Sequence, residues 1–132
     1  TPLYSSAASD VYKRQVDDAL DLIAEYGSSA AAVTLGEHGC AVLAGGERFV
    51  SPGFAIDAVD TTGAGDVFHG AWLHGVLEGW DSRRIAAFAN AVAAMACRGL
   101  GGRTAIPGAA EAAAFIEARG GAPPVRRPRR RP

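Results

Sequence analysis

Apolar residues near the start of the chain recur at the three- and four-residue spacing of an amphipathic helix. The members of this stripe are Val16, Ala19, Leu20, Ile23 and Ala24. Gly27 follows them, in the position where a glycine often ends a helix, so we predict a helix over residues 16–26. Residues 1–15 have neither a helical nor a strand period, and we interpret them as a non-native or disordered leader.

Short runs rich in strand-forming residues come next, and turn signals separate them. The letters GEHG, GG and PG stand between four such runs, which cover residues 31–35, 40–44, 48–51 and 54–59. We predict that all four are strands.

Helical patterns fill the rest of the chain. The first covers residues 65–78 and is apolar nearly all round, which predicts a buried helix. Asp81 or Ser82 caps the next helix, which runs to about Arg98, and a last helix covers roughly residues 108–118. Strands followed by helices, with no internal repeat, predict a layered α/β fold. We place one domain at residues 16–119 and a disordered tail at residues 120–132.

Composition narrows the class of protein. A chain of 132 residues with 48% hydrophobic side chains can bury one modest core without a disulfide or zinc scaffold. Cys40 and Cys97 form no CxxC pair, so we expect reduced thiols. No apolar run approaches the roughly 20 residues that cross a bilayer, and no signal-peptide pattern is present. We therefore predict a cytoplasmic protein without membrane contact.

The charge is divided unevenly along the chain. The last seven residues hold five arginines, which leaves the rest of the chain acidic. Such a tail could bind nucleic acid through its phosphates. We favour a solvated end instead, because no aromatic side chain interleaves the arginines as in single-strand binders.

Candidate chemistry concentrates in DTTGAGD, residues 60–66, where a predicted strand meets a predicted helix. Gly63 and Gly65 permit a tight turn and leave no side chain between the backbone and a ligand. The N–H groups of a first helical turn lack internal acceptors and carry partial positive charge, an arrangement typical of phosphate sites. Asp66 adds a carboxylate, which in phosphoryl transfer orients the acceptor hydroxyl and takes its proton.

A simpler interpretation is that these residues only cap a helix, since Gly and Asp are favoured there for stability alone. A lone GxGD pattern leaves the two interpretations equally open. The longer context favours the functional one. DTTGAGDVFHGA closely resembles the C-terminal signature of the ribokinase-like, or PfkB, family of carbohydrate and nucleoside kinases.

Two further segments follow the order of that family. VTLGEHGC resembles its nucleotide-contacting strand and turn, and FANAVAAMACRGLGGRTAIP resembles its adenine-side helix and loop. The resemblance covers about residues 16–116. It implies a ribokinase-like α/β/α sandwich, of which this chain would supply the C-terminal half.

The resemblance also implies roles for individual residues. Asp66 would be the catalytic base, and the backbone of Gly63, Ala64 and Gly65 would form the anion hole. The nucleotide would contact Thr34, Gly36, Gly39, Gly65 and Asn90, with Asn90 against the adenosine. A monovalent cation, usually K⁺, would be held by Asp60, Thr62, Ala96, Gly99, Gly101 and Ala105. Ala105 stands where relatives often have Ser.

The implied activity is transfer of phosphate from ATP, with Mg²⁺, to a hydroxyl of a sugar or related small molecule. There are two alternatives: a nucleoside kinase of the same family and a non-catalytic nucleotide-binding module. If the full-length protein is a kinase, it could form a homodimer. GDVFHGA is more similar to the sugar-kinase branch of the family than to its hydroxymethylpyrimidine-kinase branch. The family's Asn-x-x-Glu motif is absent upstream of TLG, and its sugar-binding half and lid are missing, so we interpret the chain as a kinase fragment that is inactive alone.

Overall fold

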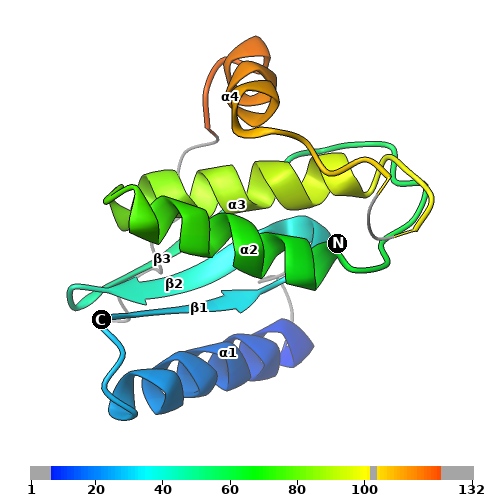
Figure 1. The fold of residues 1–132 in the computed structure, drawn as a ribbon. Coiled ribbons are helices and arrows are strands. Elements are labelled where there is room, and N and C mark those ends of the chain that lie inside the picture. Colours follow the sequence, from blue (N-terminus) through cyan, green and yellow to red (C-terminus); the bar gives the residue numbers. More distant parts are fainter. Residues whose placement is uncertain (1–6, 102–103, 123–132) are drawn as a thin grey trace.

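The computed structural model describes residues 7–101 and 104–122 and arranges them in layers (Figure 1). A three-stranded antiparallel sheet lies between helix α1 on one face and helices α2 and α3 on the other, with α4 packed outside α3. The elements are α1 (Ala7–Glu25), β1 (Ala30–Thr34), the 3-10 turn η1 (Gly36–His38), β2 (Cys40–Ala44), β3 (Glu47–Ser51), α2 (Ala64–Leu77), α3 (Ser82–Ala96) and α4 (Ala109–Ala118). Residues 1–6 of the predicted leader and residues 123–132 of the predicted tail lie outside the described residues.

The sheet is a meander in which each strand pairs with its neighbour in the chain. Gly45 and Gly46 have φ values of +57° and +76° and form the two-residue turn between β2 and β3. This conformation matches the twist of the flanking strands and strongly favours glycine at both positions. The predictions for the first three strands are therefore confirmed.

The central strand β2 divides the core into two parts. Its side chains alternate between the two faces of the sheet, as the period of a strand requires. Cys40 and Val42 face α2 and α3 and belong to the larger cluster, whereas Ala41 faces Val16 and Leu20 of α1. The strand is thus buried on both faces, and it joins the two outer layers.

The predicted fourth strand, residues 54–59, is wrong. The segment is irregular, and its backbone bonds to a helix end instead of to a strand: the N–H groups of Val59 and Asp60 donate to the carbonyl of Cys97 at 2.8 Å and 3.1 Å. Pro52 has no N–H to extend the ladder beyond β3. Phe54 of this segment is 7% exposed, so its apolar side chain is buried although the segment pairs with no strand.

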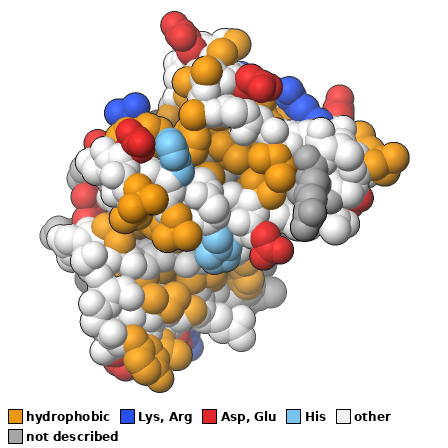
Figure 2. Space-filling view, viewed as in Figure 1, with side chains coloured by type: hydrophobic (Ala, Val, Ile, Leu, Met, Phe, Trp, Pro, Cys, Tyr) orange, Lys and Arg blue, Asp and Glu red, His pale blue; other side chains and the backbone are white. Residues whose placement is uncertain are grey.

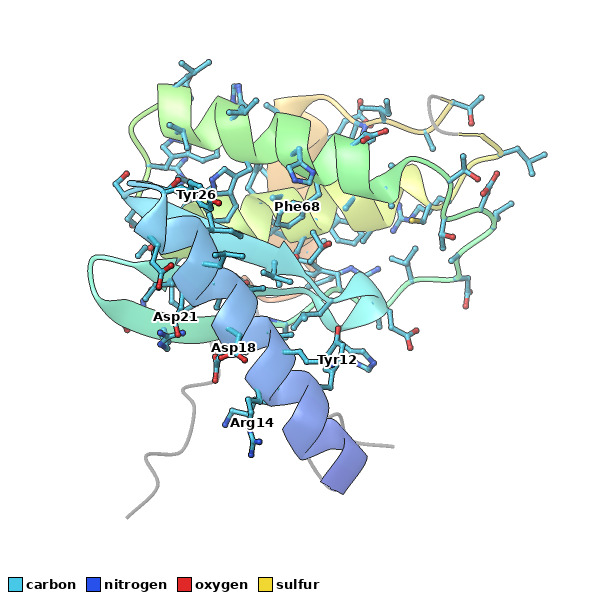
Figure 3. The ribbon with its side chains drawn as sticks, turned by 90° about the horizontal axis from the view of Figure 1, so that it is seen from below. Tyr12, Arg14, Asp18, Asp21, Tyr26 and Phe68 are labelled. Atoms are coloured by element: carbon cyan, nitrogen blue, oxygen red, sulfur yellow. The ribbon has the colours of Figure 1, made fainter. Side chains whose placement is uncertain are left out.

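Helix α1 begins at Ala7, well before the predicted start at Val16. Val16 and Leu20 are nearly buried against the sheet, and a docked helix extends at little cost through residues of good helix propensity such as Lys13 and Arg14. The expectation that residues 7–15 lack regular structure is wrong, whereas their non-native origin stays a prediction. Figure 3 shows α1 crossing the sheet. Asp21 of this helix forms an ion pair with Arg48 of β3.

Helix α2 is only partly buried, although its sequence predicts a helix covered on all sides. Phe68 and Ala71 pack inward, while Leu73, Val76 and Leu77 are 61%, 51% and 85% exposed. Figure 2 shows hydrophobic side chains gathered over the region of α2 on this face of the molecule. Within the part of the chain that the structure describes, nothing covers this side of α2.

Helix α3 has the buried, amphipathic character that its sequence predicts. Asp81 is its N-cap, and the Asp81 carboxylate accepts a hydrogen bond from the backbone N–H of Arg84 at 2.9 Å. The helix ends at Ala96, close to the predicted end. Among the described residues, no helix is both long and apolar enough to cross a membrane.

Candidate functional site

The start of α2 forms the structural centre of the candidate site. Gly63 is the N-cap residue, and its φ of +74° lies in the left-handed region that favours glycine. The N–H of Val67 bonds to the Gly63 carbonyl at 3.0 Å, but the N–H groups of Gly65 and Asp66 belong to the first turn, where the helix itself offers no acceptor. A Cβ at Gly65 would meet no atom within 4 Å, so no side chain or loop crowds the outer side of this turn.

Asp66 lies in the first turn of the same helix and is exposed. The structure therefore places a solvent-facing carboxylate beside N–H groups that are available to an anion. This is the arrangement that the GAGD pattern predicts, and the role of Asp66 as a base stays a prediction.

Asp60 ties the loop before α2 to the loop after α3. One oxygen of the Asp60 carboxylate accepts from the hydroxyl of Thr62 at 2.6 Å and from its N–H at 2.9 Å, and the other accepts from the N–H of Gly101 at 2.9 Å. These bonds stabilise the ionised carboxylate, and they lower the pKa of Asp60, with the Thr62 hydroxyl contributing most. The two loops are thereby held together although they are far apart in the chain.

The residues predicted to bind a monovalent cation gather around this junction. Hydrogen bonds join Asp60 to Thr62 and to Gly101. Gly99 packs tightly in the loop after α3, since a Cβ on Gly99 would be 2.7 Å from the Cβ of Ala105. Ala96 ends α3 just before Cys97, whose carbonyl accepts from Asp60. Cation binding itself stays a prediction. Over residues 7–101 and 104–122, no group of three or more His, Cys, Asp or Glu side chains is placed to hold a metal ion.

A groove of about 970 Å³ runs along α2 from this junction. Thr62, Gly63, Asp66 and Gly101 form its polar end, and Phe88 and Val92 of α3 lie at its apolar side. The groove is therefore lined at one end by two predicted catalytic positions, Gly63 and Asp66, and by two predicted cation positions, Thr62 and Gly101.

The predicted nucleotide turn lies elsewhere, between β1 and β2. Thr34 and Gly36 are exposed, and the N–H of Leu35 donates to the carbonyl of Gly39 at 2.8 Å to close the turn. Gly39 has a φ of +98° and is buried. Thr34, Gly36 and Gly39 are not among the residues that line the groove. Nucleotide contact by this turn stays a prediction.

Asn90 is directed into the protein. It is 5% exposed, and its amide nitrogen lies 3.0 Å from the Ser51 carbonyl, 3.1 Å from the Ser51 hydroxyl and 3.3 Å from the Pro52 carbonyl. Sequence reasoning placed Asn90 against the adenosine and missed Ser51. A serine at the last position of a strand, directly before Pro-Gly, was the available signal.

His69 also contacts the first turn of α2. Its Nδ1 lies 2.6 Å from the carbonyl oxygen of Gly65, one turn earlier in α2. A carbonyl can only accept, so Nδ1 carries the proton in this contact. The imidazole thus supports the glycine-containing first turn.

The amino-acid sequence matches a known protein family over most of its length. The family model described as "pfkB family carbohydrate kinase" matches residues 6–109. The ribokinase of Bacillus subtilis is 35% identical over 75 residues, which are 57% of this chain and 26% of that protein.

Solved structures extend the likeness to the fold. A candidate ribokinase II of E. coli, solved with ATP and Mg²⁺, is 30% identical with a TM-score of 0.72, over 77% of this chain and 33% of that one. A nucleoside kinase of Burkholderia thailandensis, solved with inosine, is 32% identical with a TM-score of 0.68, over 78% and 34% of the two chains. The chain therefore spans about a third or less of the length of these relatives. It has the ribokinase-like α/β fold, and it belongs to the pfkB family of carbohydrate kinases.

Proposed function

We propose that this chain carries the phosphoryl-transfer site of an ATP-dependent kinase that phosphorylates a hydroxyl group of a sugar. The observation that supports this most is the exposed carboxylate of Asp66 in the first turn of α2, next to the N–H groups of Gly65 and Asp66. A carboxylate that can act as a base and N–H groups that can stabilise phosphoryl charge are two of the groups that phosphoryl-transfer enzymes use.

The proposed mechanism assigns one task to each group. The first-turn N–H groups and the helix dipole stabilise the negative charge on the transferring phosphoryl group. The Asp66 carboxylate orients the acceptor hydroxyl and takes its proton as the new O–P bond forms, while the bond from the γ-phosphorus to the bridging oxygen breaks and ADP leaves. The contact of His69 with the Gly65 carbonyl and the left-handed Gly63 keep this turn in place.

The start of α2 is suited to a phosphate group of ATP. The open backbone at Gly65 and the donors around it suit a phosphate group. Mg²⁺ would be bound together with the phosphates of ATP and would neutralise part of their charge. Potassium at the Asp60 junction is proposed from the family resemblance alone.

The acceptor class and the activity of the isolated chain follow from the same resemblance. We favour a sugar over a nucleoside because of the GDVFHGA letters. The chain corresponds to at most about a third of its relatives' length, and we propose that these 132 residues alone do not turn over substrate.

The proposal is tested in a longer protein that joins this segment to the remaining two thirds of the family's length. We expect ADP release with one class of sugar, and we expect Asp66→Asn to reduce kcat by about 10²- to 10⁴-fold, because the amide cannot accept the hydroxyl proton. The affinity for ATP should change little, since Asp66 meets the acceptor and not the nucleotide.

Asp57→Asn is the matched control, because Asp57 is an exposed acid in the irregular segment before the site. Full activity of the Asp66 variant would overturn the role of Asp66. ATP binding without ADP release from any sugar or nucleoside would favour the non-catalytic module instead.

A further inference from the structure

The imidazole of His69 holds one particular backbone group of α2. Its Nδ1 lies 2.6 Å from the carbonyl oxygen of Gly65, and Nδ1 is the donor because a carbonyl can only accept. In an α-helix a carbonyl faces the N–H of the residue four positions later, which uses one of its two lone pairs. The imidazole therefore adds a second donor to a carbonyl that the helix geometry already supplies with one.

The orientation of this imidazole is supported by the core. The rings of His69 and Phe68 meet edge to face, with their centroids 6.1 Å apart and their planes at 82°. This is a favourable geometry for two aromatic rings, and Phe68 is itself 4% exposed and belongs to the larger core cluster. The side chain of His69 is exposed, so a substitution at this position leaves the core intact.

The Gly65 carbonyl and the Asp66 N–H are two ends of the same peptide group. In a helix the carbonyl points toward the C-terminal end and the N–H toward the N-terminal end, where the Asp66 N–H has no acceptor within the helix. Hydrogen bonds in a chain polarise one another, so a donor at the carbonyl makes the N–H of that peptide a stronger donor. His69 thus acts on the Asp66 N–H from the opposite side of the peptide.

We propose that His69 is a positioning residue for phosphoryl transfer, whose Nδ1–H group orients and polarises the peptide between Gly65 and Asp66. The inference rests on the proposed function and deepens it. The polarised Asp66 N–H is the donor to the transferring phosphoryl group, and the fixed peptide also sets the place from which the Asp66 carboxylate leaves the backbone. In this role His69 acts through one peptide group and contacts neither ATP nor the acceptor.

The test compares two substitutions of nearly equal size. In His69→Asn the side-chain nitrogen is one bond from Cγ, as Nδ1 is in histidine, so it can donate to the Gly65 carbonyl. His69→Leu offers no donor. Leucine has a higher helix propensity than asparagine, so a merely structural role makes His69→Leu the milder change, whereas the proposal makes it the more damaging one.

The first measurement is the ¹⁵N resonance of the Asp66 amide in the 132-residue chain, because a backbone nitrogen responds to hydrogen bonding at the preceding carbonyl. Both variants lack the imidazole ring, so their comparison excludes its ring-current effect. We expect the resonance to lie upfield in His69→Leu relative to His69→Asn. Leu73→Asn is the matched control, because Leu73 is an exposed residue one turn further along α2, and it should leave the resonance unchanged. Equal Asp66 shifts in the two His69 variants would overturn the proposal.

The second measurement is turnover in the longer protein that joins this segment to the rest of the family's length. We expect kcat to fall about three- to tenfold in His69→Leu and to stay within about twofold in His69→Asn, with the KM for the sugar unchanged. An equal loss in both variants would contradict the role of the Nδ1–H donor. If the longer protein transfers no phosphate, the proposed function fails and the role in phosphoryl transfer fails with it, while the Asp66 shift still decides whether His69 polarises the peptide.

Discussion

At the scale of single residues, burial determines the chemistry of both thiols. Cys40 is fully buried between the sheet and α3, and burial raises the pKa of its thiol to about 12, although a hydrogen bond with Asn90 lowers it in part. Burial and the nearby charge of Asp60 also raise the pKa of Cys97. Both side chains therefore stay neutral near physiological pH and behave as small hydrophobic groups.

The raised pKa of Cys40 has a measurable effect on stability. Its ordinary pKa is 9.0, so above about pH 9 the unfolded chain releases this proton while the folded chain keeps it up to about pH 12. Ionisation favours the unfolded state, and the contribution of Cys40 to the free energy of unfolding is lost as the pH rises, by at most about 1.4 kcal/mol per pH unit. Urea unfolding at pH 8, 9 and 10 in reductant measures this slope.

Cys40→Ala is the comparison, because it removes only this titration from the total slope. We expect the difference in unfolding free energy between the native chain and Cys40→Ala to shrink as the pH rises. A difference that is constant with pH would contradict the buried, neutral thiol.

At the scale of elements, the sequence predicted what depends on local patterns. The GG turn, the Asp81 cap and the apolar face of α3 are local signals, and the structure confirms the hairpin and the helix that they indicate. The strand over residues 54–59 was wrong because pairing depends on a neighbour that no local pattern reveals. The early start of α1 was missed because it depends on docking of Val16 and Leu20.

Close packing between α2 and α3 depends on a glycine. A Cβ on Gly75 would lie 2.8 Å from Cγ1 of Ile85 and 3.2 Å from the Trp80 ring, whereas a Cβ on Gly70 would meet nothing within 4 Å. We expect Gly75→Ala to be less stable than Gly70→Ala by about 1–3 kcal/mol, because only the former forces the helices apart. Gly70→Ala should itself stabilise the helix by up to about 1 kcal/mol. Thermal or urea unfolding checks the order, and equal stabilities would contradict the close contact.

At the scale of the whole molecule, the candidate site was predictable where it is continuous in sequence and not where it is assembled from distant parts. The GAGD start of α2 follows from its own letters. The bond between Asp60 and Gly101, and the inward direction of Asn90, depend on how α3 packs. The exposure of one side of α2 was not predictable for the same reason. The apolar pattern of a helix does not show which of its faces pack against another element.

The exposed face of α2 leads to a prediction for solubility. Leu77 is 85% exposed at the end of α2, whereas Leu20 is 1% exposed under the sheet. We expect Leu77→Lys to change the free energy of unfolding by no more than about 0.5 kcal/mol, because a surface site tolerates charge. Its solubility should rise as apolar surface is removed.

Leu20→Lys serves as the contrast, since it buries an unpaired charge and should unfold the chain. Precipitation curves and urea unfolding measure both effects. A large loss of stability in Leu77→Lys would contradict the exposure of this side chain.

The order of the strands bears on how fast the chain folds. Because β1, β2 and β3 pair in chain order, the sheet needs only short loops to close. A hairpin such as β2–β3 forms in about 1–10 μs, and topologies rich in such local contacts have low barriers. The bond from Asn90 to Ser51 spans 39 residues and must wait for α3. The sheet can therefore assemble early, and the contacts that hold residues 51–53 against α3 complete the fold last.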